Sequence, residues 1–237
     1  MAVIGVCFLL GGLLSPVWAG SKGKSPVAPY VEITSPAAEF PTNAGEVTVT
    51  VHFKADANPT DKKEKATGNV KTIILLLNGK EVARFENKPN VKEDTIDFTV
   101  DISGIVDQAI VFAAQAFQGN VNAGGAATSV PVPVIVDRTA PALDQLTPAP
   151  ESFVPTAKPT ISTRIIDALA GVDAATLVMK LDGNPVAAAF ADNVLSFTPQ
   201  ADLAEGEHTV AVTAKDTAGN EATAAWTFAV DTEAPVL

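Results

Sequence analysis

The sequence contains one cysteine, one tyrosine, two tryptophans and two histidines in 237 residues. A single cysteine cannot form an intrachain disulfide, and it excludes a zinc site built from several cysteines. Basic residues are also scarce, with 16 Lys and Arg against 27 Asp and Glu and a net charge of −11. Because affinity for nucleic acid comes largely from clustered Lys and Arg, this balance argues against a nucleic-acid partner.

Apolar residues, in contrast, are plentiful: 47% of the chain is hydrophobic and 18% is charged. A chain of this composition can bury a core, which excludes the intrinsically disordered class. Its length exceeds the usual domain size of about 100–150 residues. We therefore expect either one large domain or two ordinary ones.

The chain begins with an apolar segment. Residues 1–14 carry no charge, and Val17 and Ala19 stand at positions −3 and −1 of a potential cleavage site. This pattern predicts a signal peptide over residues 1–19, cleaved after Ala19, and a secreted or cell-surface protein. Since a membrane span needs about 20 apolar residues, we expect no stable span after cleavage, with an uncleaved anchor as the alternative. Cys7 lies in this segment, so the mature chain would contain no cysteine.

A sequence motif in the middle of the chain is repeated at its C-terminus. Residues 136–143 read Val-Asp-Arg-Thr-Ala-Pro-Ala-Leu, and residues 230–237, 94 positions later, read Val-Asp-Thr-Glu-Ala-Pro-Val-Leu. That spacing is the length of one β-sandwich domain. Four further segment pairs keep the same order: 34–40 with 147–153, 77–82 with 181–186, 98–99 with 197–198, and 119–120 with 219–220. The shared order indicates an internal duplication.

The hydrophobic pattern is typical of strands. Apolar and polar residues alternate with period two over residues 47–53, 209–214 and 225–230, which buries one face of a strand and exposes the other. Asn78-Gly79 and Asp182-Gly183 separate apolar runs, as in two-residue hairpin turns. The sequence shows no sustained helical periodicity, so the predicted fold class is all-β.

These signals predict two tandem immunoglobulin-like β-sandwiches preceded by a signal peptide. The expected boundaries are a signal peptide over 1–19, a disordered leader over 20–27, Ig-like domain 1 over 28–137 with a charged loop insertion at 57–69, Ig-like domain 2 over 138–232, and the start of a following linker or repeat over 233–237. Further domains are expected C-terminal to residue 237.

The acidic charge is concentrated in the second half. Residues 20–137 carry a net charge of −3 and residues 138–237 one of −8. Aspartates occupy predicted loop ends at Asp137, Asp167, Asp173, Asp216 and Asp231. Because calcium prefers several oxygen ligands, these five residues are candidate calcium ligands, and no other cofactor is expected. The alternative is that Asp216 and Asn220 shape a turn through hydrogen bonds to the backbone, while Asp137 and Asp231 cap linkers.

Several segments of the second half together resemble a known family. They are residues 167–173, 181–183, 203–210 and 214–220 and the closing Val-Asp-Thr-Glu-Ala-Pro. In this order they resemble the bacterial Ig-like repeats found in tandem on secreted and surface-attached proteins, including large adhesins and the front ends of YD-repeat proteins. The first half matches loosely, since its counterpart turn, residues 117–120, lacks the aspartate. The resemblance implies a sandwich used as a rod segment or binding module, without catalysis, and in some tandem members calcium holds the junctions rigid.

The inventory of catalytic groups is small. His52 and His208 have no nucleophile motif nearby and are expected at surface or edge positions. Glu205 and Glu207 are expected to be solvated rather than a glycosidase pair. Trp226 and Phe228, two positions apart in a strand, are expected to share the core face.

The sequence therefore predicts a protein that is not an enzyme. It favours a non-catalytic exported structural or adhesion module, an Ig-like spacer of a bacterial surface or secreted protein, whose partner is an unknown protein or glycan surface ligand. The alternatives are the non-catalytic N-terminal region of a larger secreted enzyme or YD-repeat toxin, and a carbohydrate-binding module. The carbohydrate-binding module would require exposed aromatic residues on one sheet face.

Overall fold

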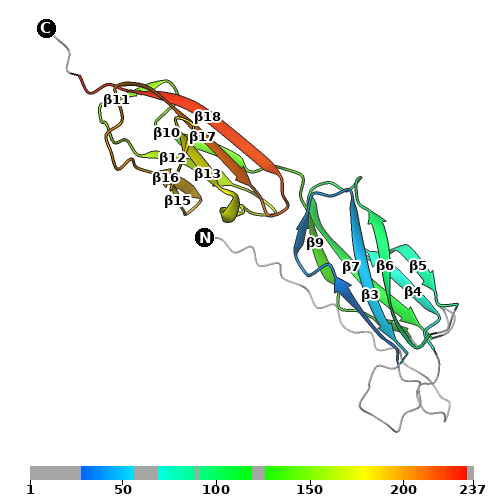
Figure 1. The fold of residues 1–237 in the computed structure, drawn as a ribbon. Helices are drawn as coiled ribbons and strands as arrows, with labels where there is room; N and C mark the ends of the chain where they lie inside the picture. Colours follow the sequence, from blue (N-terminus) through cyan, green and yellow to red (C-terminus); the bar gives the residue numbers. More distant parts are fainter. Residues whose placement is uncertain (1–27, 56–68, 89–90, 119–125, 234–237) are drawn as a thin grey trace.

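A computed structural model describes residues 28–55, 69–88, 91–118 and 126–233 (Figure 1). Within these ranges the all-β prediction is confirmed, because the only helix is a single 3₁₀ turn, η1 (Ala174–Thr176). No helix in the described ranges is long and apolar enough to cross a membrane. The predicted signal peptide and leader, the loop insertion apart from Asn69, and residues 234–237 lie outside the described residues.

Two sheets form the first sandwich. One has the strand order β1-β3-β6, and the other has the order β2-β9-β7-β4-β5 with β8 beside β7. The strands are β1 (Tyr30–Ser35), β2 (Phe40–Thr42), β3 (Glu46–Lys54), β4 (Thr72–Leu77), β5 (Lys80–Glu86), β6 (Glu93–Asp101), β7 (Gln108–Phe117), β8 (Ala126–Thr128) and β9 (Val132–Val136).

Two further sheets form the second sandwich, with the orders β10-β12-β16-β15 and β11-β18-β17-β13-β14. The strands are β10 (Ala142–Thr147), β11 (Ser152–Val154), β12 (Ile161–Ile166), β13 (Val178–Leu181), β14 (Asn184–Val186), β15 (Ala189–Ala191), β16 (Val194–Phe197), β17 (Gly206–Lys215) and β18 (Glu221–Val230). Each sandwich has its own hydrophobic core.

The second sandwich repeats the topology of the first. The order β1-β3-β6 corresponds to β10-β12-β16, and the order β2-β9-β7-β4-β5 corresponds to β11-β18-β17-β13-β14. In both, a short strand pairs in parallel with the last long one, β2 with β9 and β11 with β18. The second sandwich adds β15 at the sheet edge. The duplication read from the sequence is therefore also a duplication of the fold.

One matched pair of segments aligns differently from the sequence reading. Phe40 pairs with Val134. Ser152 pairs with Phe228, which lies 94 residues after Val134. The counterpart of Phe40 is therefore Ser152 and not Phe153. The preceding residues, Glu39 and Glu151, agree with this register, because their φ angles are 60° and 61°.

Alternating strands build each core as the sequence predicts. In β3, Val49, Val51 and Phe53 are fully buried, while Thr50 and His52 between them are half-buried. In β18, the side chains of Trp226 and Phe228 are also buried, which confirms the predicted core face. Removing this apolar surface from water is the main force that stabilises the sandwiches.

The two predicted hairpin turns are present. Asn78 and Asp182 both have a φ of 51°, and the following Gly79 and Gly183 both have a φ of 79°. Two consecutive residues with positive φ match the twist of the flanking strands.

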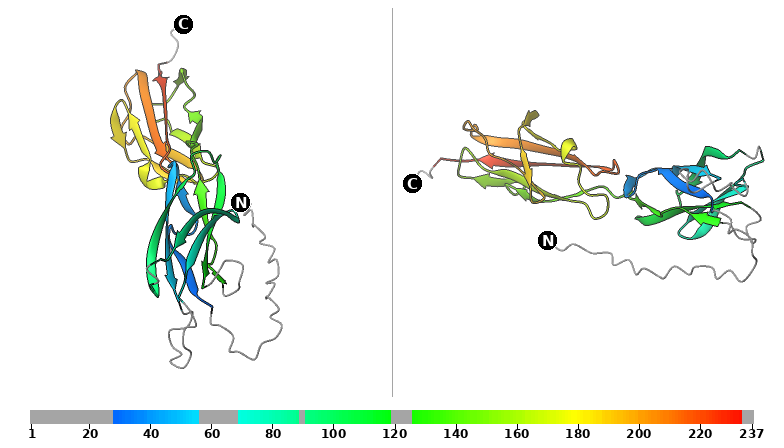
Figure 2. Two further views of the ribbon diagram at one scale, coloured as in Figure 1. Left: turned by 90° about the vertical axis from the view of Figure 1, so that its right-hand side faces the viewer. Right: turned by 90° about the horizontal axis from the view of Figure 1, so that it is seen from below.

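The two sandwiches lie end to end (Figures 1 and 2). The last strand of the first sandwich, β9, leads through residues 137–141 directly to β10. The loops of the second sandwich over residues 167–171 and 216–220 meet the chain there. This junction contains most of the acidic residues that the sequence singled out.

Candidate functional site

Arg138 anchors the linker to the first sandwich. Its guanidinium donates hydrogen bonds to the carbonyl oxygens of Ile105, at 2.7 Å, Ala44, at 2.9 Å, and Ile102, at 3.1 Å. Its backbone N–H donates to Asp107 Oδ1 at 3.0 Å. A planar group with several donors can satisfy separate carbonyls at once, so the chain leaves the first sandwich in a fixed direction.

Asp137 and Asn220 connect the two sandwiches. Asp137 Oδ2 accepts a hydrogen bond from the backbone N–H of Ala170 at 2.8 Å. Asn220 Nδ2 donates to the carbonyl oxygen of Asp137 at 3.0 Å, and Asn220 Oδ1 accepts from Asn43 Nδ2 at 3.1 Å. The side chain of Asn220 therefore contacts both the linker and a loop of the first sandwich.

The two loops of the second sandwich are also tied to each other. The backbone N–H of Thr217 donates to the Gly171 carbonyl at 2.9 Å, and the Thr217 hydroxyl donates to the Ala170 carbonyl at 2.5 Å. Asp216 accepts from the backbone N–H and the side-chain Nδ2 of Asn220, at 2.8 Å and 2.7 Å. The second sandwich thus presents a preformed pair of loops to the linker.

Three of the five candidate calcium ligands come together at this junction. Asp137, Asp167 and Asp216 each place a carboxylate oxygen within 4.8 Å of the other two. Asp137 and Asp216 are only 1% and 2% exposed. Asp137 and Asp167 also line a hollow of about 220 Å³. Within the described part of the chain, no Lys, Arg or His forms an ion pair with these three carboxylates.

Such a cluster has an electrostatic cost. Two like charges about 4 Å apart repel by about 1–4 kcal/mol, depending on how well water screens them. Backbone N–H groups offset part of this repulsion, since Asp167 Oδ1 accepts from Leu169 and Gly171 at 3.1 Å and 2.7 Å. The turn-shaping role considered from the sequence belongs to Asp216 and Asn220, and their hydrogen bonds match it. The carboxylates still have oxygen lone pairs for a cation.

The other two candidates lie elsewhere. Asp173 caps η1, and its side chain accepts from the backbone N–H of Ala175 at 3.0 Å. Asp231 follows β18, at the opposite end of the second sandwich from Asn220. The ten residues of β18 separate the two ends by about 30 Å.

Sequence reasoning missed three residues of the junction: Asn43, Asp107 and Arg138. The repeated motif contained a signal for Arg138, because Thr232 replaces it in the second copy. Nothing in the sequence pattern indicated Asn43, whose contact depends on how the two sandwiches meet.

His208 differs from its predicted surface position, because it is only 7% exposed. Its Nδ1 lies 2.7 Å from Asp182 Oδ2 and its Nε2 lies 2.9 Å from the Ala204 carbonyl. Burial by itself lowers the pKa of His208, but the Ala204 carbonyl and Asp182 outweigh it, and the pKa is raised. Two acceptors around the ring favour the doubly protonated imidazolium, which compensates for burial.

Glu205 also differs from the expectation of a merely solvated acid. Its carboxylate accepts from the backbone N–H of Thr232 at 3.1 Å and from the Thr232 hydroxyl. Glu207 is exposed, as expected.

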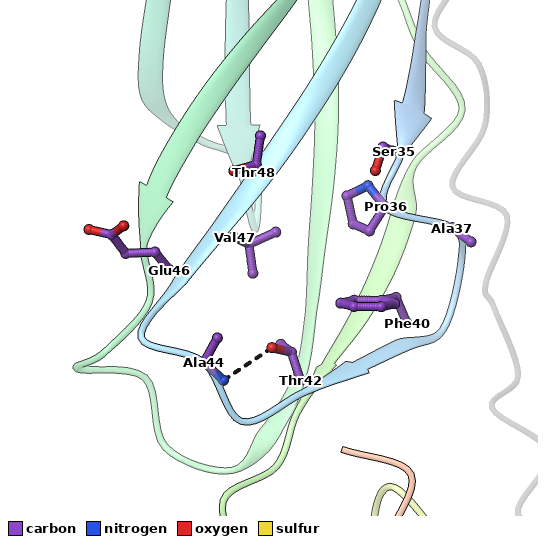
Figure 3. Close-up of a pocket in the computed structure, with 9 residues that line it drawn as sticks. All are labelled: Ser35, Pro36, Ala37, Phe40, Thr42, Ala44, Glu46, Val47 and Thr48. Carbon is purple, nitrogen blue, oxygen red and sulfur yellow. Dashed lines mark hydrogen bonds between the residues drawn. The ribbon is translucent and has the colours of Figure 1, made fainter. Parts of the chain in front are cut away.

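A hollow of about 370 Å³ lies beside β2 and the start of β3 (Figure 3). Pro36 and the ring of Phe40 face it, and Glu46 supplies its only carboxylate. A hydrogen bond of 3.1 Å from the Ala44 N–H to Thr42 Oγ1 closes the lower loop. The lining contains no pair of acid–base groups and no nucleophile beside a base, so it offers no recognisable catalytic arrangement.

Exposed aromatic residues do not share one sheet face in the described part of the chain. Tyr30 is 36% exposed on β1, Phe40 is 45% exposed on β2, and Phe153 is 74% exposed on β11. This distribution does not form the stacking platform that a carbohydrate-binding module would require.

Comparison with known proteins gave a family match for the second half. Residues 151–232 match the family described as bacterial Ig-like domain. A comparison with curated proteins found no match.

The solved structures that match have low sequence identity and low structural similarity to this chain. The fibronectin(III)-like modules of Clostridium thermocellum CbhA share 19% identity, with 85% of this chain and 94% of that chain covered and a TM-score of 0.44. CopC from Methylosinus trichosporium OB3b shares 18%, with 41% and 99% covered and a TM-score of 0.34. Chimeric titin Z1Z2 shares 15%, with 88% and 100% covered and a TM-score of 0.31. At these identities the likeness concerns the fold alone.

An Ig-like domain fold is typical of a non-catalytic structural module. The sandwich topology, the duplicated strand order and the family match agree for the second half of the chain. The family match therefore concerns residues 151–232, which are similar to the bacterial Ig-like domain.

Proposed function

We propose that this protein is an exported, non-catalytic spacer whose two sandwiches are held in a fixed end-to-end orientation. The observation that carries this proposal is the hydrogen-bond network across the junction, in which Asn220 contacts Asp137, Thr139 and Asn43. A flexible tether would need no such network. A spacer that presents another element at a defined distance from a surface would.

The strength of the junction can be judged from its contacts. Asp137 and Asn220 make bonds across the junction to Ala170, Asn43 and the linker backbone. A partly buried hydrogen bond contributes about 0.5–1.5 kcal/mol net, so several together favour the closed junction by a few kcal/mol. The loss of one such hydrogen bond should measurably increase the population of molecules in which the two sandwiches are not aligned end to end.

The test is a distance measurement between the sandwiches. Spin labels at Thr99→Cys and Lys180→Cys, in a chain carrying Cys7→Ser, report the distribution of inter-sandwich distances by pulsed electron resonance. Both labelled positions are exposed. We expect a narrow distribution that becomes at least twofold broader in Asn220→Ala.

Glu207→Ala is the matched control, because Glu207 is exposed on β17 and away from the junction. It should leave the distribution unchanged. A distribution in the unsubstituted chain as broad as that of a flexible glycine–serine linker would overturn the spacer proposal.

Calcium at the junction is the second element of the proposal. Asp137, Asp167 and Asp216 would supply carboxylate oxygens, which are the ligands that calcium prefers. The support is their mutual closeness, the burial of two of them and the lack of an ion-pair partner in the described ranges. A bound cation would remove the repulsion and stiffen the junction further.

Thermal unfolding with and without calcium tests this element. A ligand that binds only the native state stabilises it by RT ln(1 + [L]/Kd), about 2.7 kcal/mol at a hundredfold excess over Kd. We expect millimolar calcium to raise the midpoint over that in EDTA, and Asp167→Asn to abolish the rise. Asp173→Asn is the matched control and should retain it. An equal midpoint in calcium and EDTA would refute the calcium site and leave the spacer untouched.

Export rests on the apolar N-terminal segment and its small residues at Val17 and Ala19. Expression in a bacterium followed by mass spectrometry of the intact exported protein provides the test. A chain beginning at Gly20 is expected, and an uncleaved chain retained in the membrane fraction would favour the anchor.

A further inference from the structure

The chain leaves the two sandwiches, after β9 and after β18, with the same backbone hydrogen bond; we call these two places the exits. The N–H of Asp137 donates to the Thr42 carbonyl, and the N–H of Asp231 donates to the Val154 carbonyl, both at 3.0 Å. Asp137 directly follows β9, and Asp231 directly follows β18, 94 residues later. The short parallel strand of each sandwich therefore fixes the same aspartate position.

The side chains around the two exits also match. Asp137 Oδ1 accepts from the Thr139 N–H at 3.0 Å, and Asp231 Oδ1 accepts from the Glu233 N–H at 3.3 Å. In each sandwich a carboxylate directly before a long strand, β7 or β17, bonds to the segment that leaves the sandwich. Asp107 does so through the Arg138 N–H and the Thr139 hydroxyl in the first sandwich, and Glu205 through the N–H and hydroxyl of Thr232 in the second.

The two aspartates differ in what covers them. Asp137 is 1% exposed, because the loops of the second sandwich lie over it and the Ala170 N–H occupies its Oδ2. Asp231 is exposed, and among the described residues only the Glu233 N–H bonds to its side chain. Asp231 Oδ2 therefore has no partner among the described residues, whereas Asp137 Oδ2 accepts from Ala170.

We propose that the end formed by Asp231, Thr232 and Glu205 is a docking surface for a further Ig-like sandwich that resembles the second sandwich of this chain. The occupant would carry a loop like residues 167–171 and a turn like residues 216–220. Its loop N–H would donate to Asp231 Oδ2, as Ala170 donates to Asp137. Its asparagine would donate to the Asp231 backbone carbonyl, as Asn220 donates to that of Asp137. This inference rests on the proposed function and names its partner.

The first sandwich of another copy fits this surface less well. By the strand register Gln118 stands at the position of Asp216, so the first sandwich has a neutral amide where the second has the carboxylate that accepts from Asn220. We therefore expect a sandwich that resembles the second one to dock here in preference to the first sandwich of another copy.

The new junction would differ from the existing one in two contacts. By the strand register the counterpart of Asn43 is Pro155, which has no hydrogen-bond donor in its backbone or side chain. The counterpart of Arg138 is Thr232. We therefore expect the docked arrangement to depend more strongly on Asp231 and Glu205 than the existing junction depends on Asp137 and Asp107.

The test uses the full chain extended at Leu237 by a second copy of residues 144–237, which continues the repeat in register. In a Cys7→Ser background, one spin label at Lys180→Cys and another at its counterpart in the added copy measure the new junction. A narrow distance distribution is expected. Asp231→Ala should broaden it at least twofold, while Glu207→Ala, at the same end of the sandwich, should not.

Each outcome separates the possibilities. A broad distribution in the unsubstituted extended chain, or one that Asp231→Ala leaves narrow, would overturn the docking proposal. Labels at Thr99→Cys and Lys180→Cys measure the existing junction in the same molecule, so a broad result there marks failure of the spacer function instead. Concentration-dependent oligomers of the unextended chain that Asp231→Ala abolishes would show that the occupant is a second copy. Unchanged Trp226 fluorescence confirms that the variant is folded.

Discussion

His208 is the residue whose environment departs most from its sequence context. Position 208 begins an alternating strand, yet both ring nitrogens face acceptors and the ring packs 5.7 Å from that of Phe228. The counterpart in the first sandwich is Ile110, which is fully buried. A histidine ring therefore occupies a core position that the duplicated copy fills with an apolar side chain.

This environment makes the second sandwich sensitive to pH. The pKa of His208 is raised above its ordinary value of about 6.5, so its stabilisation is complete below that pH and is lost as pH rises through the folded value. Partial burial raises the pKa of Asp182, but His208 and the Thr209 N–H outweigh it and the pKa is lowered. Its contribution is complete above about pH 3.9 and is lost as pH falls through the folded value. The pair is thus most stabilising between about pH 4 and pH 6.5.

We predict that His208→Leu removes the decline in stability that the second sandwich shows as pH rises above about 6.5. Loss of hydrogen bonds to a charged group should cost about 1–3 kcal/mol at pH 6 and less at pH 9. Urea unfolding followed by Trp226 fluorescence measures this. His52→Leu, in the first sandwich, should leave the Trp226 transition unchanged. A transition with the same pH dependence in His208→Leu would contradict the prediction.

At this scale the sequence predicted residue types better than contacts. The aspartates at loop ends were identifiable, but the grouping of Asp137 with Asp167 and Asp216 depends on how two loops and a linker meet in space. Asp173 and Asp231 carry the same local signal and lie elsewhere. Periodicity reports which face of a strand a residue occupies, and it carries no information about partners across a junction.

The strands and turns were the most predictable elements. Alternation over residues 47–53 and 225–230 marks the buried faces of β3 and β18, because the side-chain period of a strand is two. The parallel edge strands β2 and β11 have only three residues each, too few for a periodic signal. Their pairing with the last long strand depends on tertiary packing.

The hairpin between β4 and β5 provides a prediction at the scale of elements. Gly79 has a φ of 79°, a conformation that costs residues with a Cβ about 1 kcal/mol or more, although the space around it is open. Gly79→Ala should therefore destabilise the first sandwich by about 1 kcal/mol.

Gly104→Ala is the matched control, because the space around Gly104 is equally open and its φ is not positive. It should leave stability unchanged or increase it slightly. Scanning calorimetry resolves the transition of the first sandwich. Equal effects of the two substitutions would show that the hairpin does not depend on the positive φ.

At the scale of the whole molecule, the duplicated sandwiches differ where the chain leaves each of them, after β9 and after β18. After β9, Arg138 bonds to three carbonyls, and after β18, Thr232 bonds among the described residues to Glu205. The motif that revealed the duplication thus also contains the substitution that distinguishes the two junctions. An array built from such units would be stiffest at the junction that carries the arginine.

We predict that Arg138→Ala loosens the orientation of the sandwiches without unfolding the second. Loss of the guanidinium leaves the carbonyls of Ala44, Ile102 and Ile105 without this donor, so the linker is held to the first sandwich by fewer bonds. The distance distribution between labels at Thr99→Cys and Lys180→Cys should broaden at least twofold, and the first sandwich should lose about 1–2 kcal/mol.

Arg138→Lys distinguishes charge from geometry. A lysine keeps the positive charge but lacks the planar fork that reaches three carbonyls, so it should restore only part of the narrow distribution. The Trp226 unfolding transition should be the same in all three proteins, because Arg138 makes no described contact with the second sandwich. Full restoration by lysine would mean that the junction needs a charge at this position and not the arginine fork. A distribution that stays narrow in Arg138→Ala would assign the fixed orientation to Asp137 and Asn220 alone.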